Sequence, residues 1–229
     1  MIAIRKLIQF GALTIAAMAI GGAGRPVNWN NTIAQTALGS HILGNPAAKV
    51  KLTEFVSYTC PHCSDFETHA DGPLRIGYVR SGQVSVEVRH IIRDPIDLTV
   101  AMLTNCGPKE KFFLNHAAFM RSQATWIRPL VTSTPAQRQR WFAENIAQRN
   151  RAIASDFHFY EIMATRGYDR VTVDRCLTDN AMANRIGQQS QNATDVIGVD
   201  STPSFTLNGL LLSGTHEWSL LEPQIRARL

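Results

Sequence analysis

The 229-residue chain has little of what marks a nucleic-acid-binding protein. Its net charge is +5, and Arg5, Lys6 and Arg25 in or beside the N-terminal segment account for three of these charges. No run of Lys and Arg interleaved with aromatic residues occurs, and neither an internal repeat nor a low-complexity tract is visible. With so weak a basic bias, we expect no nucleic-acid partner.

Apolar runs of full membrane-spanning length are also missing. The stretch from Leu7 to Ile20 is mostly apolar but contains two polar residues, and it is short for a bilayer span of about 20 residues. It follows Arg5 and Lys6 and precedes the small residues Gly21 to Gly24. This order is typical of a secretory signal, so we interpret residues 1–24 as a signal peptide, with an uncleaved anchor as the alternative. A lipoprotein-type anchor lacks the cysteine it needs.

Cysteine is scarce, and its spacing argues against a metal site. Cys60 and Cys63 form a C-x-x-C pair, whereas Cys106 and Cys176 lie seventy residues apart with no second zinc-type spacing. Structural zinc usually needs four such ligands, so we expect no metal and keep half of a zinc site as the minor alternative. An exported protein meets an oxidising compartment, where an even number of cysteines favours pairing. We therefore predict a structural disulfide between Cys106 and Cys176, two unpaired thiols being the alternative.

The chain is organised around the stretch from Val50 to Cys63, V-K-L-T-E-F-V-S-Y-T-C-P-H-C. Its first eight residues are rich in β-branched and aromatic types and predict a strand, and the spacing after Cys63 predicts a helix. The thiols would then lie at a helix N-terminus, where unpaired backbone N–H groups and the helix dipole stabilise a thiolate. Pro61 suits the first helical turn.

This placement predicts a redox dithiol. We expect Cys60 to be the exposed nucleophile and Cys63, one turn further along, the more buried resolving thiol. His62 lies between them and can donate a hydrogen bond or carry a positive charge that stabilises the thiolate. Its alternative interpretation is a spectator surface histidine.

Around this stretch, the pattern predicts a strand, a helix and a second strand, then a helical block, and finally two strands and a helix. The first helix is expected to run to a break at Gly72-Pro73, with a second piece over 74–80. The second strand covers about 84–92, the helical block about 97–192, the hairpin 204–212 around Asn208-Gly209, and the closing helix about 217–228. Residues 25–44 are expected to be loop, with a short helix near 33–38. A helix starting at Pro135 is expected to carry Trp141, Phe142 and Ile146 on one face.

Two motifs in this order resemble the DsbA-like branch of the thioredoxin superfamily. One is C-P-H-C at Cys60 to Cys63 with an acid, Glu54, six residues before it; the other is G-V-D-S-T-P-S-F from Gly198 to Phe205, followed by Asn208-Gly209. The resemblance covers about residues 45–229. It implies an α/β thioredoxin fold with an inserted all-helical domain, which agrees with the pattern of elements. The resulting organisation is a signal peptide (1–24), a leader (25–44), a first thioredoxin part (45–96), a helical insertion (97–194) and a second thioredoxin part (195–229).

The resemblance also assigns roles to residues. It implies a cis bond before Pro203, which would place the Thr202 backbone beside the dithiol, available to an extended substrate chain. It is the main reason to expect Glu54 to be buried and to relay a proton to or from Cys63, since the strand alternation alone leaves a solvent-facing position open. It further implies a strongly lowered pKa for Cys60.

The function expected from the sequence is that of a periplasmic thiol–disulfide oxidoreductase that introduces disulfide bonds into secreted proteins without a cofactor. Its partners would be reduced or misoxidised secreted proteins and, by resemblance, a quinone-linked membrane oxidase. The alternatives are a disulfide isomerase or reductase of the same family and, from another class, a peptide-binding chaperone whose cysteines are incidental.

Overall fold

A computed structural model describes residues 27–229, so the predicted signal peptide lies outside the described residues. Its centre is a six-stranded sheet in the order β1-β2-β4-β3-β5-β6. Strands β3 and β4 are parallel, and every other neighbouring pair is antiparallel. The strands are β1 (Ile33–Gln35), β2 (His41–Gly44), β3 (Val50–Val56), β4 (Val84–His90), β5 (Ser204–Leu207) and β6 (Leu210–Leu211).

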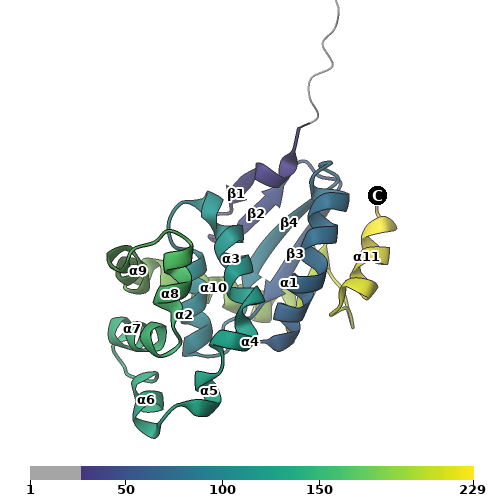
Figure 1. The fold of residues 1–229 in the computed structure, drawn as a ribbon. Helices are drawn as coiled ribbons and strands as arrows, with labels where there is room; N and C mark the ends of the chain where they lie inside the picture. The colour runs from purple at the N-terminus through teal and green to yellow at the C-terminus, as the bar shows by residue number, and fades with distance from the viewer. Residues whose placement is uncertain (1–26) are drawn as a thin grey trace, which may run out of the picture.

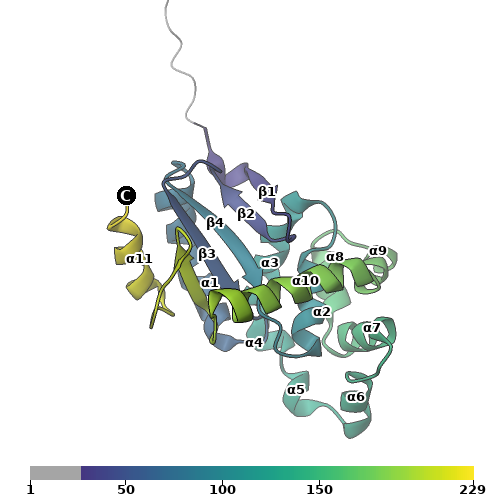
Figure 2. The same cartoon turned by 180° about the vertical axis from the view of Figure 1, so that it is seen from behind.

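Helices cover both faces of the sheet. Helices α1 (Pro61–Leu74) and α3 (Phe112–Arg121) lie over one face, and α10 (Asn180–Asn192) crosses the other, as Figures 1 and 2 show. The C-terminal α11 (Trp218–Arg226) packs beside α1.

The segment between β4 and β5 is helical throughout its regular structure. Besides α3 and α10 it contains α2 (Pro95–Thr104), α4 (Gln123–Trp126), α5 (Pro129–Thr132), α6 (Pro135–Arg140), α7 (Ile146–Asp156), α8 (Phe159–Thr165) and α9 (Arg170–Leu177). Short 3₁₀ turns occur at Trp29–Asn31 and Lys109–Lys111, and π turns at Arg75–Val79 and Ala193–Ile197. Helices α5, α6 and α7 lie farthest from the sheet in Figure 1. The architecture confirms the predicted thioredoxin fold with a helical insertion.

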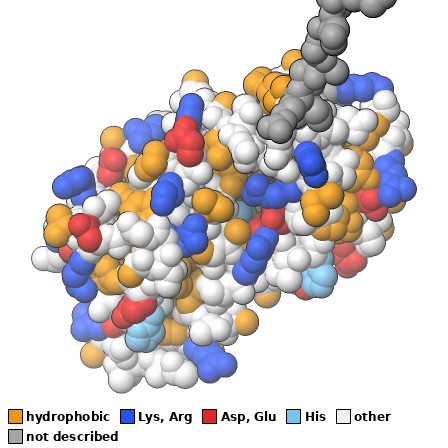
Figure 3. Space-filling view, turned by 45° about the horizontal axis from the view of Figure 1, so that its top comes forward, with side chains coloured by type: hydrophobic (Ala, Val, Ile, Leu, Met, Phe, Trp, Pro, Cys, Tyr) orange, Lys and Arg blue, Asp and Glu red, His pale blue; other side chains and the backbone are white. Residues whose placement is uncertain are grey.

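One hydrophobic core joins the sheet to these helices. It runs from strand residues such as Val50 and Val86 to Phe119 and Phe157 in the helical segment, all of them buried. A shared core means that the helical segment and the sheet stabilise each other rather than folding as unrelated units. On the face in Figure 3, charged side chains are dispersed among neutral and apolar ones. None of the helices between residues 27 and 229 combines the length and the hydrophobicity of a membrane span.

The prediction for residues 25–44 was wrong over residues 33–44. Instead of a loop with a short helix, residues 33–44 form the β1–β2 hairpin, which extends the sheet through pairing of β2 with β4. The turn depends on Gly39, whose φ of +82° is accessible to glycine without strain. Burial of His41 and Leu43 against the core favours the strand over the local sequence preference.

Two helix predictions also need correction. Helix α1 continues through Gly72-Pro73 into the π turn, because Ala70, Leu74 and Tyr78 keep one buried face against the core. That packing outweighs the backbone hydrogen bond that a proline removes. Further along, α6 begins at Pro135 as predicted but ends at Arg140, and Phe142 is 68% exposed rather than on a buried face.

Candidate active site

The Cys60 thiol lies where β3 passes into α1. Strand β3 ends at Val56, and a short turn closes when the Cys60 N–H donates to the Ser57 carbonyl oxygen at 3.2 Å. Cys60 then has extended backbone angles as the N-cap of α1, with Pro61 in the first turn. The strand-to-helix junction predicted from the sequence is therefore the one that the chain adopts.

The surroundings of Cys60 stabilise its thiolate. They lower the pKa of Cys60 to about 5, chiefly through the hydrogen bond from the Cys63 thiol, with further contributions from the Thr202 side chain and the backbone N–H groups of Cys63 and His62. Burial acts in the opposite direction but is outweighed. Apart from Thr202, these donors belong to the first turn of α1, as expected for a thiolate at a helix N-terminus.

Cys60 is not the exposed residue that we predicted. Only 3% of its surface is accessible, because the segment around Thr202 covers it. The Cys60 Sγ–H donates to the Thr202 carbonyl oxygen at 3.2 Å. Cys60 nevertheless lines a surface groove whose other walls include His62, Ile91, Val199 and Thr202. Attack on this sulfur must therefore come from within the groove.

The second thiol, Cys63, is fully buried. Burial raises the pKa of the Cys63 thiol well above its usual value, and the hydrogen bond to Cys60 and the charges of Cys60 and Glu54 add to this. In this structure neither cysteine is bonded, so the site is in its dithiol form. The two sulfurs thus differ strongly in acidity, with the outer one much easier to ionise.

Glu54 is buried in the middle of β3, 4% exposed. Its Oε1 has no hydrogen-bond partner in the described part of the chain. Burial raises the pKa of Glu54 well above that of an ordinary carboxyl, and the charges of Glu67 and Asp71 raise it further. Burial in this position favours the protonated form of the carboxyl group, and a charge on Glu54 in turn raises the pKa of Cys63.

His62 lies on the surface, and its side chain is not among the groups that lower the pKa of Cys60. Its backbone N–H is one of them. The contribution of His62 to the pKa of Cys60 thus comes from its main chain, and the predicted role of the imidazole stays a prediction.

The Thr202–Pro203 peptide bond is cis, as the resemblance implied. Thr202 precedes β5, which pairs with β3 through the register Glu54 with Phe205. This pairing brings two segments that are far apart in the sequence to the same end of the sheet.

Three residues that sequence reasoning missed hold the turn before Cys60. The Gln123 side-chain amide donates to the Tyr58 carbonyl oxygen at 2.6 Å and to that of Cys60 at 2.8 Å. Asp97 is buried and accepts from the Ser57 hydroxyl at 2.6 Å and from the Tyr58 N–H at 2.8 Å. Asp94 accepts from the Thr59 hydroxyl at 2.9 Å. All three come from the helical segment, and no local sequence signal connects them to the dithiol.

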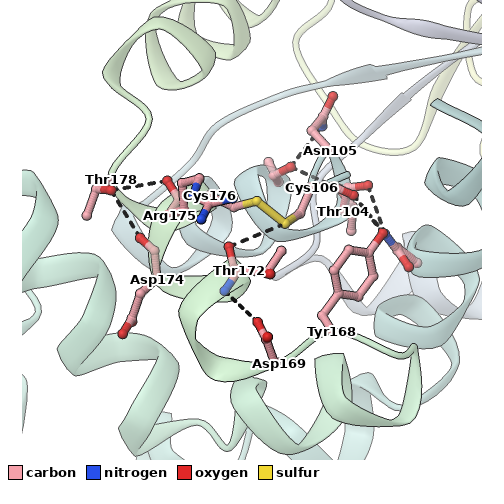
Figure 4. The surroundings of a disulfide bond; sticks show 12 residues. Thr104, Asn105, Cys106, Tyr168, Asp169, Thr172, Asp174, Arg175, Cys176 and Thr178 are labelled. Atoms are coloured by element: carbon pink, nitrogen blue, oxygen red, sulfur yellow. Dashed lines mark hydrogen bonds between the residues drawn. A yellow bond between two sulfur atoms is a disulfide. The ribbon is translucent and has the colours of Figure 1, made fainter. Parts of the chain in front are cut away.

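The second pair of cysteines is bonded. Cys106 follows α2 and Cys176 lies in α9, with their Cα atoms 5.6 Å apart, and Figure 4 shows the bridge between these elements. The Tyr168 hydroxyl donates to the Cys106 carbonyl oxygen at 2.8 Å beside it. The bridge therefore joins two parts of the helical segment, apart from the dithiol. Among residues 27–229 no cluster of three His, Cys, Asp or Glu side chains is arranged to hold a metal ion.

A thioredoxin-type sheet with a C-x-x-C dithiol at the start of α1 and a cis-proline segment against it defines a protein of the thiol–disulfide exchange class. A family model described as "Thioredoxin" matches residues 36–227. The chain therefore belongs to this family.

Individual relatives agree with this placement. A crystal structure of a protein-disulfide isomerase from Novosphingobium aromaticivorans is 58% identical, covers 82% of this chain and 96% of its own, and has a TM-score of 0.80. The α-DsbA1 structure of Wolbachia pipientis is 21% identical, covers 84% of this chain and 92% of its own with a TM-score of 0.66, and supports the fold alone. A Rickettsia felis protein named provisionally as a protein-disulfide oxidoreductase is 30% identical over 74% of this chain and 53% of its own length. The match with the corresponding Rickettsia bellii protein is 23% identical and covers 74% of this chain and 57% of that one. The chain thus spans little more than half the length of these curated relatives.

Proposed function

We propose that the protein is an exported thiol–disulfide oxidoreductase that donates the Cys60–Cys63 disulfide to reduced cysteines of secreted proteins. The observation that carries this proposal is the position of Cys60 at the N-terminus of α1 and against Thr202, in surroundings that lower its pKa to about 5. A group that stabilises the Cys60 thiolate stabilises the reduced protein and makes its disulfide a stronger oxidant.

The exchange proceeds in two displacements. A substrate thiolate attacks the Cys60 sulfur, the Cys60–Cys63 bond breaks, and its electron pair leaves on Cys63, which takes up a proton. A second substrate thiolate then attacks the substrate sulfur of the mixed disulfide and releases the Cys60 thiolate. The substrate is oxidised by two electrons, the protein is reduced by two, and the second substrate proton goes to solvent. Cys60 is a good leaving group because its thiolate is stable.

The groove beside Cys60 receives the substrate chain. Ile91 and Val199 supply apolar walls, and Thr202 supplies backbone groups that pair with an extended peptide. Arg93 and Asp200 place one charge of each sign in the same groove. A surface of this kind suits reduced, incompletely folded chains of varied sequence better than one rigid epitope.

The cellular setting of the proposal comes from residues 1–24, whose pattern predicts export to the periplasm. Reoxidation of the dithiol then requires an electron acceptor, for which we propose a quinone-linked membrane oxidase. The exchange itself requires no bound cofactor, because both electrons are held as sulfur–sulfur or sulfur–hydrogen bonds.

A second candidate is disulfide isomerisation. It is favoured by the name of the Novosphingobium aromaticivorans protein, which is 58% identical to this chain. An isomerase attacks substrate disulfides and so must keep Cys60 and Cys63 reduced, whereas an oxidase must keep them bonded. The two functions therefore use the same residues in opposite resting states.

Trapping the redox state of Cys60 and Cys63 in cells separates these candidates. An oxidase is expected to be largely disulfide-bonded at steady state, and a mostly reduced dithiol would favour the isomerase. A Cys63→Ala variant should accumulate covalent complexes with substrates, since the mixed disulfide cannot be resolved from within the protein. A Cys60→Ser variant is the control, because it removes the nucleophile. If Cys60→Ser retained full cellular activity, the protein would be a chaperone with incidental cysteines.

A further inference from the structure

A small cavity lies on the side of β3 that faces α1 and α3. It has a volume of about 20 Å³, and its lining combines the polar groups of Glu54, Glu67, Asp71 and His116 with apolar side chains such as Phe66. A single water molecule needs about 10–15 Å³ and two to four polar partners. The cavity therefore has the size and the lining of a site for one water molecule.

Two buried polar atoms at this cavity have no hydrogen-bond partner within residues 27–229. They are Glu54 Oε1 and His116 Nε2, on side chains from β3 and α3. His116 Nε2 lies 3.6 Å from Glu67 Oε2, too far for a direct hydrogen bond. Unpaired polar atoms in a protein interior are costly, so the position of both residues on one cavity indicates that they act together through a bridging molecule.

The hydrogen bonds around His116 fix its tautomer. The Thr104 hydroxyl donates to the Ala101 carbonyl oxygen at 2.9 Å, and the Tyr58 hydroxyl donates to Thr104 Oγ1 at 3.0 Å. The remaining bond, 2.9 Å between Tyr58 and His116, must then have Nδ1–H as its donor. In the neutral ring, Nε2 is consequently left without a proton and can accept one from the cavity side.

On the solvent side of the cavity, Glu67 and Asp71 form ion pairs with Arg121 at the protein surface. Arg121 contacts Glu67 at 3.3 Å and Asp71 at 2.7 Å, and the Arg121 side chain is about half exposed. Asp71 also pairs with Arg75, which lines the cavity. Across the cavity from Glu54, a series of ionisable groups thus extends from Glu67 and Asp71 to the half-exposed Arg121.

We propose that this cavity is the proton outlet of the dithiol, with Glu54 exchanging its proton through a bridging water molecule with His116 and Glu67. The proposal rests on the oxidoreductase function and extends it to residues of the helical segment. When Cys63 leaves as a thiolate, it takes the proton of Glu54, and the Glu54 carboxylate is reprotonated through the cavity. In the reverse direction, Cys63 gives its proton to the Glu54 carboxylate before it attacks. The protein oxidises nothing in these steps, which move only protons.

The step that depends on this route can be isolated. Oxidised glutathione reacts with the reduced protein in two stages: Cys60 attacks and forms a mixed disulfide, and Cys63 then loses its proton and displaces the second glutathione. Acid quenching followed by intact-mass measurement gives the rate of each stage. The ionisable groups that face Glu54 and shape the pH profile of the second stage are Tyr58, Cys63, Glu67, Asp71, Arg75 and His116.

His116→Asn is the informative variant, because its amide can keep the contact with Tyr58 while removing the atom at Nε2. We expect it to leave the first stage unchanged and to slow the second about tenfold near neutral pH, the low end for a lost acid–base group. Glu67→Gln should slow the second stage as well. His90→Asn is the matched control, since His90 is equally buried and bonds to Asn105 but does not line the cavity.

The possible outcomes are distinguishable. Equal second-stage rates for His116→Asn, Glu67→Gln and His90→Asn would overturn the outlet. If His116→Asn does not fold, the second-stage rate of Glu67→Gln relative to that of His90→Asn tests the proton outlet. An unchanged second stage in Glu54→Gln would overturn both the outlet and the role of Glu54, and leave the oxidoreductase standing. If Cys60 formed no mixed disulfide at all, the proposed function itself would be wrong.

Discussion

Cys60 Sγ lies 3.2 Å from the carbonyl oxygen of Thr202, a residue 142 positions further along the chain. The contact exists because β5 pairs with β3 and brings the cis-proline segment to the start of α1. The Thr202 backbone therefore covers the Cys60 sulfur, and an extended substrate segment can lie beside this backbone in the groove. The two motifs that identify the family are therefore two halves of one site.

Removal of the Thr202 hydroxyl should make Cys60 less acidic. The Thr202 side chain is one of the groups that lower the pKa of Cys60. Thr202→Val keeps the carbonyl and the branched shape, and we expect the pKa of Cys60 to rise by roughly one unit, because a hydrogen bond to a charged group contributes about 1.5 kcal/mol. Thiolate absorbance measures the change, and Thr202→Ser, which keeps the hydroxyl, is the control. An unchanged pKa in Thr202→Val would show that the hydroxyl does not reach the sulfur.

Asp97 should impose a pH dependence on stability. Burial raises the pKa of Asp97 from 3.8 to about 7. Between these values the folded state keeps a proton that the unfolded state has lost, so the free energy of unfolding contributed by this group falls as pH rises. In Asp97→Asn, denaturant unfolding across this range should show a shallower decline than in the native protein, together with a lower stability overall, since an amide cannot accept all the bonds from Ser57, Tyr58 and Arg93. If the free energy of unfolding changed with pH equally in Asp97→Asn and in the native protein, the raised pKa of Asp97 would be contradicted.

The Cys106–Cys176 bridge should contribute stability without affecting the dithiol. It closes a loop with a sequence separation of 70, for which the chain-entropy model gives about 4 kcal/mol. The double variant Cys106→Ala/Cys176→Ala should lose up to that much free energy of unfolding, as measured in denaturant. The pKa of Cys60 should be unchanged, and a shift in it would mean that the bridge positions the active site.

The reduced protein should gain stability relative to the oxidised protein as pH rises from about 5 to 9. In this range Cys60 is ionised in the folded state and protonated in the unfolded state, because folding lowers its pKa from 9.0 to about 5. The stabilising contribution is present above the unfolded pKa and is lost as pH falls through the folded one. The difference between the two free energies of unfolding should therefore change by about 1.4 kcal/mol per pH unit. Matched denaturant titrations of both redox forms test this, and a flat difference would argue for an ordinary thiol.

Much of the fold was accessible from the sequence because its signals are local. The strand before Cys60, the alternation of Val84, Val86 and Val88, and the turn at Asn208-Gly209 each specify an element over a few residues. Both Asn208 and Gly209 have the positive φ that such a turn requires. The hairpin at 33–44 was missed because its strands are short and depend on burial of His41 and Leu43 by distant residues.

The site was predictable only in part, for a related physical reason. The position of Cys60 at a helix start follows from the residues around it, but its burial depends on Thr202, and its turn depends on Asp97 and Gln123. These contacts form between segments that only the folded topology brings together. His116 likewise reads as a core residue at helical spacing, and only the cavity beside Glu54 distinguishes it.

Ultraviolet titration of the reduced protein tests the central claim most directly. Thiolate absorbance, corrected with a Cys60→Ser variant, reports the ionisation of Cys60 alone. The account predicts a transition near pH 5. A transition near 9, the value of an unperturbed thiol, would contradict it and leave no physical basis for a strongly oxidising disulfide.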